Sequence, residues 1–171
     1  LATRGIRVHS HLLRITEHSR LRAASPWVNQ WLHPWVRGFR GGSDPKVAFA
    51  ATSLYTELAL ALHQTMFGRL ADSSKYFDRF SHRLSETLLD AMGYDPGHLR
   101  RMAALAEQLT VYIKFLGAYG SPFTPANGHG QGLSFALLVT ASYGSLWATV
   151  ARQIEFRALG SVIVDGRALL R

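Results

Sequence analysis

The chain has 171 residues, 47% of them hydrophobic, and a formal net charge of +8 at pH 7. This length suits one domain, or one domain with extensions, and the apolar content excludes intrinsic disorder for most of the chain. The absence of cysteine excludes disulfides, thiolate zinc sites and cysteine nucleophiles.

The positive charge is concentrated in residues 1–43, which carry seven arginines against the single acid Glu17. Arginine with serine and threonine at amphipathic spacing is typical of import segments, so we expect a mitochondrial protein in the matrix or on the matrix face of the inner membrane. An arginine-rich bacterial protein is the alternative. The chain begins at Leu1, which is compatible with a removed leader or a trimmed sequence. Protein, nucleic acid or anionic lipid could each be the partner of such a basic segment.

Residues 8–24 are predicted to form a basic amphipathic helix, and Ser25-Pro26 is a start signal for a second helical segment. Pro34 is expected to kink or split this second segment. Its aromatic side chains are candidates for a core or a seam between helices, for partner binding, or for anchoring at a membrane interface. They are Trp27, Trp31, Trp35 and Phe39. We expect residues 1–43 to form an extension apart from the core.

The middle of the chain repeats a pattern in which aspartate opens, and glycine closes, a run of apolar residues at helical spacing. Asp accepts hydrogen bonds from the first helical turn, Pro suits the first helical position, and Gly adopts the left-handed conformation at a helix end. Three helices joined by short turns, with neighbours antiparallel, are therefore predicted. They run from Asp44-Pro45 to Gly68, from Asp72-Ser73 to Gly93, and from Asp95-Pro96 to Gly117.

The first of these helices has only Lys46 and Glu57 as charges, so we expect it to be largely enclosed. The other two have alternating faces. The residues expected to face inward are Tyr76, Phe77, Phe80, Leu84, Leu88 and Leu89 in the second, and Leu99, Met102, Leu105, Leu109, Tyr112, Ile113 and Leu116 in the third.

Residues 117–132 are predicted to be a long loop, which is a candidate functional or contact segment. A last helix is expected over residues 133–158, followed by a tail over 161–171 with a short extended piece. Residues 132–151 carry no charge over a length that could span a bilayer. Their hydroxyl and small side chains favour a buried helix packed on the central three, and a membrane span is the alternative.

No pattern in the sequence indicates a catalytic centre, a cofactor site or a metal site. His63 is expected to be a hydrogen-bonded core residue, and His82 and His98 to face solvent. The segment Gly128-His129-Gly130-Gln131-Gly132 lacks a preceding strand, a GxSxG motif and a phosphate-loop lysine, so a connector is the preferred interpretation. We expect the protein not to be an enzyme.

Four arginines on the second and third central helices define an alternative function, the binding of RNA phosphates. Asp78, Glu86 and Glu107 are predicted to lie on the same two helices, which favours a solvated face with salt bridges. The four residues are Arg79, Arg83, Arg100 and Arg101.

The sequence segments 76–80 and 98–102 can be aligned with one another as corresponding parts of two helices. With the short turns, residues 44–117 resemble the helical-hairpin repeats of organellar pentatricopeptide and octotricopeptide proteins. Size, helicity and expected compartment are also similar to those of helical-repeat accessory subunits of mitochondrial ATP synthase. The resemblance implies an all-α array of antiparallel helical hairpins in a non-catalytic subunit of a protein complex. It assigns no base-reading residue.

Overall fold

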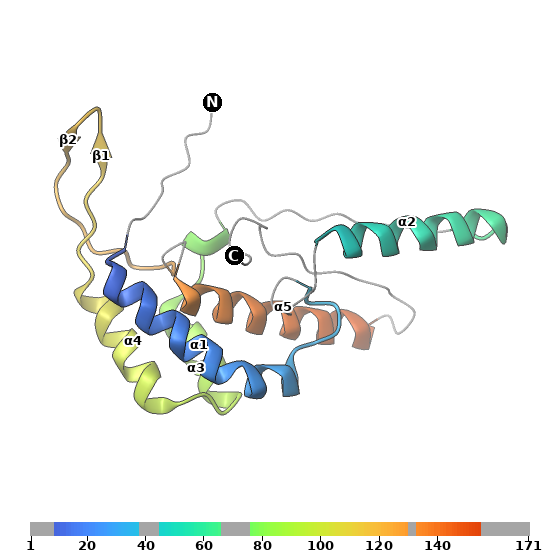
Figure 1. The fold of residues 1–171 in the computed structure, drawn as a ribbon, viewed down its shortest axis with the longest axis horizontal. Coiled ribbons are helices and arrows are strands. Elements are labelled where there is room, and N and C mark those ends of the chain that lie inside the picture. The colour runs from blue at the N-terminus through green and yellow to red at the C-terminus, as the bar shows by residue number, and fades with distance from the viewer. Residues whose placement is uncertain (1–8, 38–44, 66–75, 130–132, 155–171) are drawn as a thin grey trace. The chain divides into compact units, whose positions relative to one another are not determined.

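The computed structural model describes residues 9–37, 45–65, 76–129 and 133–154, and most of these residues are helical (Figure 1). Within the described ranges, five α-helices, one short 3-10 helix and one small antiparallel sheet follow one another. They are α1 (His11–Trp31), α2 (Pro45–Ala61), η1 (Tyr76–Asp78), α3 (His82–Ala91), α4 (Pro96–Gln108), β1 (Lys114–Phe115), β2 (Ala118–Tyr119) and α5 (Ser134–Ile154). The predicted mainly helical class is confirmed.

The described elements divide into two compact units. One unit contains α1, α2 and α5, and the other contains η1, α3, α4, β1 and β2. The predicted array of three consecutive helices over residues 44–117 is not confirmed, because α2 belongs to a different unit from α3 and α4.

Helix α1 is continuous where the sequence suggested two segments. Its N-terminus is capped by Ser10, whose side chain accepts a hydrogen bond from the Leu13 N–H. The Ser25 hydroxyl donates to the Leu21 carbonyl one turn earlier, so Ser25 lies inside the helix and does not start a new one. Pro26 is accommodated within α1, and the helix ends at Trp31, before Pro34.

The C-terminal part of α1 and the turn after it form a core with α5. Val28, Leu32 and Val36 are buried, and the His33 N–H donates to the Ser145 hydroxyl of α5 over 3.1 Å. Helices α1 and α5 are in contact. The expected separation of residues 1–43 from the core is therefore not confirmed, because their described part supplies core side chains.

Helix α2 ends at Ala61, earlier than the predicted stop at Gly68. His63 has a positive φ of 50°. The His63 N–H donates to Leu60, and the Gln64 N–H donates to Ala59. This is the Schellman arrangement, with histidine where glycine is usual. The expected core role of His63 is wrong, since the side chain is exposed. Asp44, Asp72 and Gly68 lie outside the described residues.

Helices α3 and α4 pack on one another through a short connection. Helix α3 is capped by Ser81 and not by Asp72, so it starts at His82. Gly93, with a φ of 81°, closes it as predicted: the Tyr94 N–H donates to Leu89 and the Gly93 N–H to Asp90. Asp95 caps α4 as predicted.

Helix α4 ends at Gln108, where the sequence predicted a helix continuing to Gly117. Residues 110–113 are threonine, valine, tyrosine and isoleucine, which prefer extended backbone. Val111 pairs with Phe123, and β1 pairs with β2 farther along. Gly117 therefore lies in a hairpin turn. Among the side chains expected inside, Leu84, Tyr112, Ile113 and Leu116 are exposed.

The predicted last helix is present as α5, and many of its residues are buried. Its buried side chains include Phe135, Leu138 and Val139. The Thr140 hydroxyl donates to the Ala136 carbonyl, and the Ser142 hydroxyl to the Val139 carbonyl. Among the described helices, α5 has the length and apolar composition that a membrane span requires. It contacts α1, whereas the sequence suggested packing on the three central helices.

Candidate interaction surfaces

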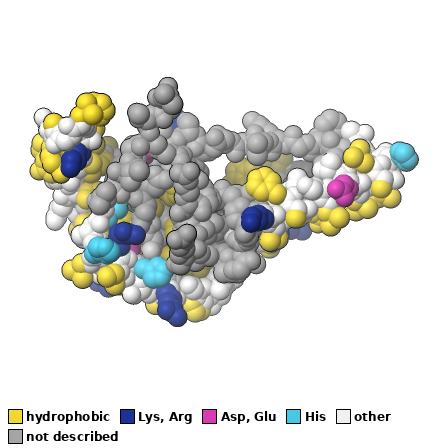
Figure 2. All heavy atoms as spheres, turned by 45° about the horizontal axis from the view of Figure 1, so that its top comes forward, with side chains coloured by type: hydrophobic (Ala, Val, Ile, Leu, Met, Phe, Trp, Pro, Cys, Tyr) yellow, Lys and Arg dark blue, Asp and Glu magenta, His cyan; other side chains and the backbone are white. Residues whose placement is uncertain are grey.

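Helix α2 exposes large apolar side chains that the sequence predicted to be enclosed. Four of them share one face, because they follow one another at intervals of seven, four and four residues. We call them the α2 stripe: Val47, Leu54, Leu58 and Leu62. All four are exposed, and Leu54 keeps 67% of its accessible surface. Figure 2 shows the hydrophobic side chains along α2.

Small side chains occupy the better-buried side of α2. Ala48 is buried, and Thr52 on the same side donates its hydroxyl to the Ala48 carbonyl over 2.9 Å. Thr56 repeats this bond to the Thr52 carbonyl. The helix thus buries alanine and satisfies its threonines internally while its leucines face outward. A soluble helix normally has the reverse distribution, which marks the α2 stripe as a contact surface.

The aromatic residues predicted to form one site do not all lie in α1, because this helix ends at Trp31. Trp27 and Trp31 lie one turn apart on α1, with ring centroids 5.2 Å apart in an edge-on arrangement, and both are partly exposed. Trp35 is buried in the turn after the helix, 6.5 Å from the ring of Trp147. Phe39 lies outside the described residues. Trp35 therefore belongs to the core, as one of the three sequence interpretations proposed.

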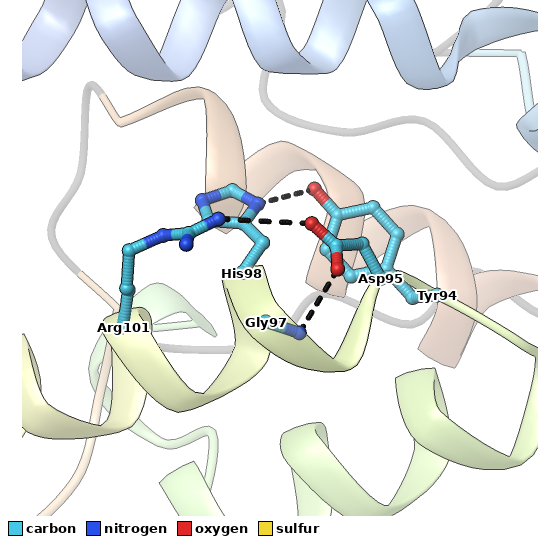
Figure 3. Close-up of polar contacts among 5 residues, drawn as sticks. All are labelled: Tyr94, Asp95, Gly97, His98 and Arg101. Carbon is cyan, nitrogen blue, oxygen red and sulfur yellow. Dashed lines mark hydrogen bonds and ion pairs between the residues drawn. The ribbon is translucent and has the colours of Figure 1, made fainter.

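The four arginines proposed for RNA binding are all exposed and lie in the same unit. Arg101 is 3.7 Å from a carboxylate oxygen of Asp95, and both side chains are more than half exposed (Figure 3). Residues 76–129 contain five basic residues (Arg79, Arg83, Arg100, Arg101, Lys114) and five acidic ones (Asp78, Glu86, Asp90, Asp95, Glu107). The described part of this unit thus has no net charge with which to attract a phosphate backbone.

Two histidines expected at the surface make internal hydrogen bonds. His98 is buried, and its Nδ1 shares a 2.7 Å hydrogen bond with the Tyr94 hydroxyl (Figure 3). His82 is partly buried, and its Nε2 lies 2.8 Å from the Gly128 carbonyl oxygen. The expectation of solvent-facing histidines was wrong: His98 meets Tyr94, four residues earlier, and His82 meets Gly128, which is 46 positions away in the sequence.

His129 forms a buried contact that sequence reasoning missed. Its Nε2 lies 3.0 Å from the Ser85 hydroxyl, and that hydroxyl donates to the Ser81 carbonyl at the start of α3. Ser85 has no exposed surface, so a substrate in solution cannot reach its hydroxyl. The contact joins His129 to Ser85 of α3, and these two residues are 44 positions apart in the sequence. No local pattern could have indicated it.

The hairpin formed by β1 and β2 (Figure 1) is a second exposed apolar surface (Figure 2). Phe115, Leu116 and Ile113 are exposed, as are two tyrosines on the other side of the strands. Tyr112 and Tyr119 meet edge to face at 6.4 Å, and the Lys114 ammonium lies 5.2 Å from the centre of the Tyr119 ring. The sequence analysis placed Tyr112, Ile113 and Leu116 on the inward face of a helix and Tyr119 in the loop that follows it.

Comparison with protein families, with curated protein sequences and with solved structures found no match. Within the described residues, no group of three or more His, Asp or Glu side chains is arranged to hold a metal ion. Among the described residues, the α2 stripe and the hairpin are candidate interaction sites.

Proposed function

We propose that the chain is a non-catalytic subunit of a larger protein assembly and that the α2 stripe contacts a neighbouring subunit. The observation that carries this proposal is the exposure of four large apolar side chains on one face of a single helix. Monomeric soluble proteins rarely expose apolar patches of this kind, except at binding sites.

Energetic considerations support a protein partner for the α2 stripe. Full burial of a valine or leucine side chain contributes about 1.5–3 kcal/mol of favourable transfer free energy. Four such side chains on one face can form the buried centre of a helix-in-groove interface. The charged residues Lys46 and Glu57 are on another side of α2. The partner surface is therefore expected to be an apolar groove or helix face.

The proposed assembly is mitochondrial, in keeping with the basic N-terminal composition, and ATP synthase is the specific candidate that the resemblance suggests. The N-terminal segment contributes through Trp27 and Trp31, which keep exposed surface on α1. Deletion of residues 1–43 is not a suitable test, because Val28, Leu32 and Val36 belong to the core with α5. Substitution at the surface of α2 tests the attachment without disturbing that core.

The decisive experiment compares tagged full-length protein with the double variant Leu54→Gln, Leu58→Gln after native purification from its own cells. Both replacements are good helix formers at exposed positions, so the circular dichroism spectrum should be unchanged. We expect the wild type to migrate in a large native complex with stoichiometric subunits, and the double variant to lose them. Glu57→Gln, made on another side of the same helix, is the matched control and should retain the complex.

Two results would contradict the proposal. The first is a double variant that still enters the complex at the wild-type yield. The second is a wild-type protein that purifies as a monomer. The described part of the arginine-bearing unit has no net charge, which disfavours RNA binding as a second function.

A further inference from the structure

The hairpin has an unusual residue at its tip. Phe115 and Ala118 are paired, so Leu116 and Gly117 are the two residues of the connecting turn. Their φ angles are 47° and 85°. Positive φ at both central positions is the signature of a type I′ turn, for which Asn-Gly and Asp-Gly are the preferred sequences. Leucine in this conformation carries a steric cost that asparagine largely avoids.

The strained leucine is also the most exposed large apolar side chain among the described residues. Leu116 keeps 91% of its accessible surface, and the adjacent Phe115 keeps 73%. A turn that only had to reverse the chain would be better made with a polar residue. Strain combined with exposure of an apolar side chain is a reason to infer a function for the tip.

Exposed side chains surround the tip on both faces of the hairpin. Ile113 and Phe115 share one face, because residues two apart on a strand point the same way. Tyr119 lies directly opposite Lys114 and shares the other face with it and with Tyr112. A flat protein surface would cover one of these faces and leave the other in water. A bilayer surrounds an inserted tip on all sides.

The polarity of these side chains changes along the hairpin as insertion requires. The tip residues Phe115 and Leu116 are pure hydrocarbon. Tyr112 and Tyr119, which carry hydroxyl groups, lie behind them and are less exposed, at 55% and 67%. Tyrosine is enriched at the boundary between lipid and water, where its ring is in contact with lipid and its hydroxyl with headgroups. Lys114 can extend its ammonium to the same level.

Charge favours an anionic surface over a neutral one. No aspartate or glutamate occurs between Glu107 and Glu155, so no acidic residue of the hairpin would be repelled by lipid phosphates. The hairpin carries Lys114 and no acidic residue, while residues 76–129 as a whole carry five basic and five acidic residues. Basic residues near an anionic leaflet each contribute to attraction within a Debye length.

We propose that the β1–β2 hairpin inserts its tip, Phe115 and Leu116, into the surface of an anionic lipid bilayer, with Tyr112, Lys114 and Tyr119 at the headgroups. This contact is separate from the α2 stripe and does not depend on the proposed protein partner. It would hold the protein at a membrane face without a spanning helix.

The first test measures co-sedimentation of the full-length protein with vesicles. Vesicles of phosphatidylcholine and phosphatidylglycerol in equal parts are compared with vesicles of phosphatidylcholine alone. We expect clear binding to the anionic vesicles, and Leu116→Asn should lower it by about tenfold through loss of an inserted apolar side chain. Asparagine suits the left-handed position, so this variant should keep or strengthen the hairpin, and misfolding cannot explain its effect. Lys114→Gln should reduce the preference for anionic vesicles by about fivefold.

The matched control is Leu60→Asn, the same replacement at an exposed leucine of α2 outside the α2 stripe. Its binding to vesicles should equal that of the wild type. The absence of native cysteine permits a second measurement. A polarity-sensitive dye at Leu116→Cys should shift to the blue on vesicle addition and be quenched by lipid-attached quenchers, whereas the same dye at Leu60→Cys should not respond.

Three results would overturn the proposal. They are the absence of vesicle binding by the wild type, equal binding by Leu116→Asn, and crosslinking of a photoreactive residue at position 116 to a protein of the assembly instead of lipid. The last result would assign the tip to a protein pocket. Loss of vesicle binding by Leu116→Asn with retention of the native complex would support the lipid contact independently of the proposed function.

Discussion

Two glycines of the same unit show how the cost of a side chain depends on its surroundings. Gly117 and Gly128 both have a strongly positive φ, 85° and 91°. A Cβ atom on Gly117 would meet no other atom within 4 Å. A Cβ atom on Gly128 would lie 2.7 Å from the Cα of Asp78. At this position the Gly128 N–H also donates to the Phe80 carbonyl, which brings the two backbones together.

Gly128→Ala is expected to lower the free energy of unfolding by about 2–4 kcal/mol, because the left-handed conformation and the backbone contact both oppose a methyl group. Gly117→Ala, the matched control, should lower it by about 1 kcal/mol through conformation alone. Urea unfolding followed by circular dichroism measures both values. Equal losses for the two variants would show that the backbone contact with Asp78 has no energetic consequence.

The start of α4 is the best-defined helix terminus in the described chain. The Asp95 carboxylate accepts a hydrogen bond from the Gly97 N–H over 2.9 Å, and Pro96 occupies the first helical position. The other carboxylate oxygen of Asp95 is 3.7 Å from Arg101 (Figure 3). Since both side chains are largely exposed, the ion pair is screened by water and the cap is the larger contribution.

Asp95→Ala is expected to destabilise the protein by about 1 kcal/mol, because it leaves the first-turn N–H groups without their acceptor. Asp95→Asn retains an acceptor and should stay within about 0.5 kcal/mol of the wild type. Arg101→Gln, which removes only the ion pair, should have a similarly small effect. Thermal and urea unfolding provide the comparison. A larger loss for Arg101→Gln than for Asp95→Ala would reverse this ranking of cap and ion pair.

The whole molecule combines one buried apolar helix with exposed apolar surfaces on each of its units. Helix α5 has the composition of a membrane span, yet Leu138, Val139 and Ala148 are buried and its neighbour is α1. Lipid would have to replace that packing if α5 crossed a bilayer. This packing favours a core helix for α5, and the membrane contact that we propose is made by the hairpin.

We expect alkaline carbonate to release the protein from membranes of its own cells, because a hairpin tip is a peripheral contact and α5 is held by α1. The measurement is the distribution of the full-length protein between supernatant and pellet. A known single-span protein and a known peripheral protein from the same membranes serve as references. Retention in the pellet with the single-span protein would favour the alternative in which residues 132–151 cross the bilayer.

Helix termini that depend on a few neighbouring residues could be predicted from the sequence. The Asp95-Pro96 start and the Gly93 stop were correct, because a cap is a hydrogen bond between groups no more than five residues apart. The existence of α5 followed from a long apolar run with no competing strand pattern. For α3, the N-terminal cap is Ser81, whereas the sequence analysis placed the cap at Asp72. The prediction of a capped helix start was correct, but the capping residue was wrong.

Burial and strand pairing depend on residues far away in the sequence. Prediction was correct for the inward faces of α3 and α4, where Leu89, Leu99 and Met102 are buried, and wrong for α2 and for the hairpin. Helices α2 and α5 are both strongly apolar, and nothing local distinguishes the exposed Leu54 from the buried Leu138. Residues 109–117 could continue a helix or form a hairpin, and the choice depends on pairing with residues 118–123. The sequence alone therefore determined the helical class and several helix ends, because their hydrogen bonds are local. Only the tertiary structure identified the α2 stripe and the hairpin tip, because exposure is a property of the packed chain.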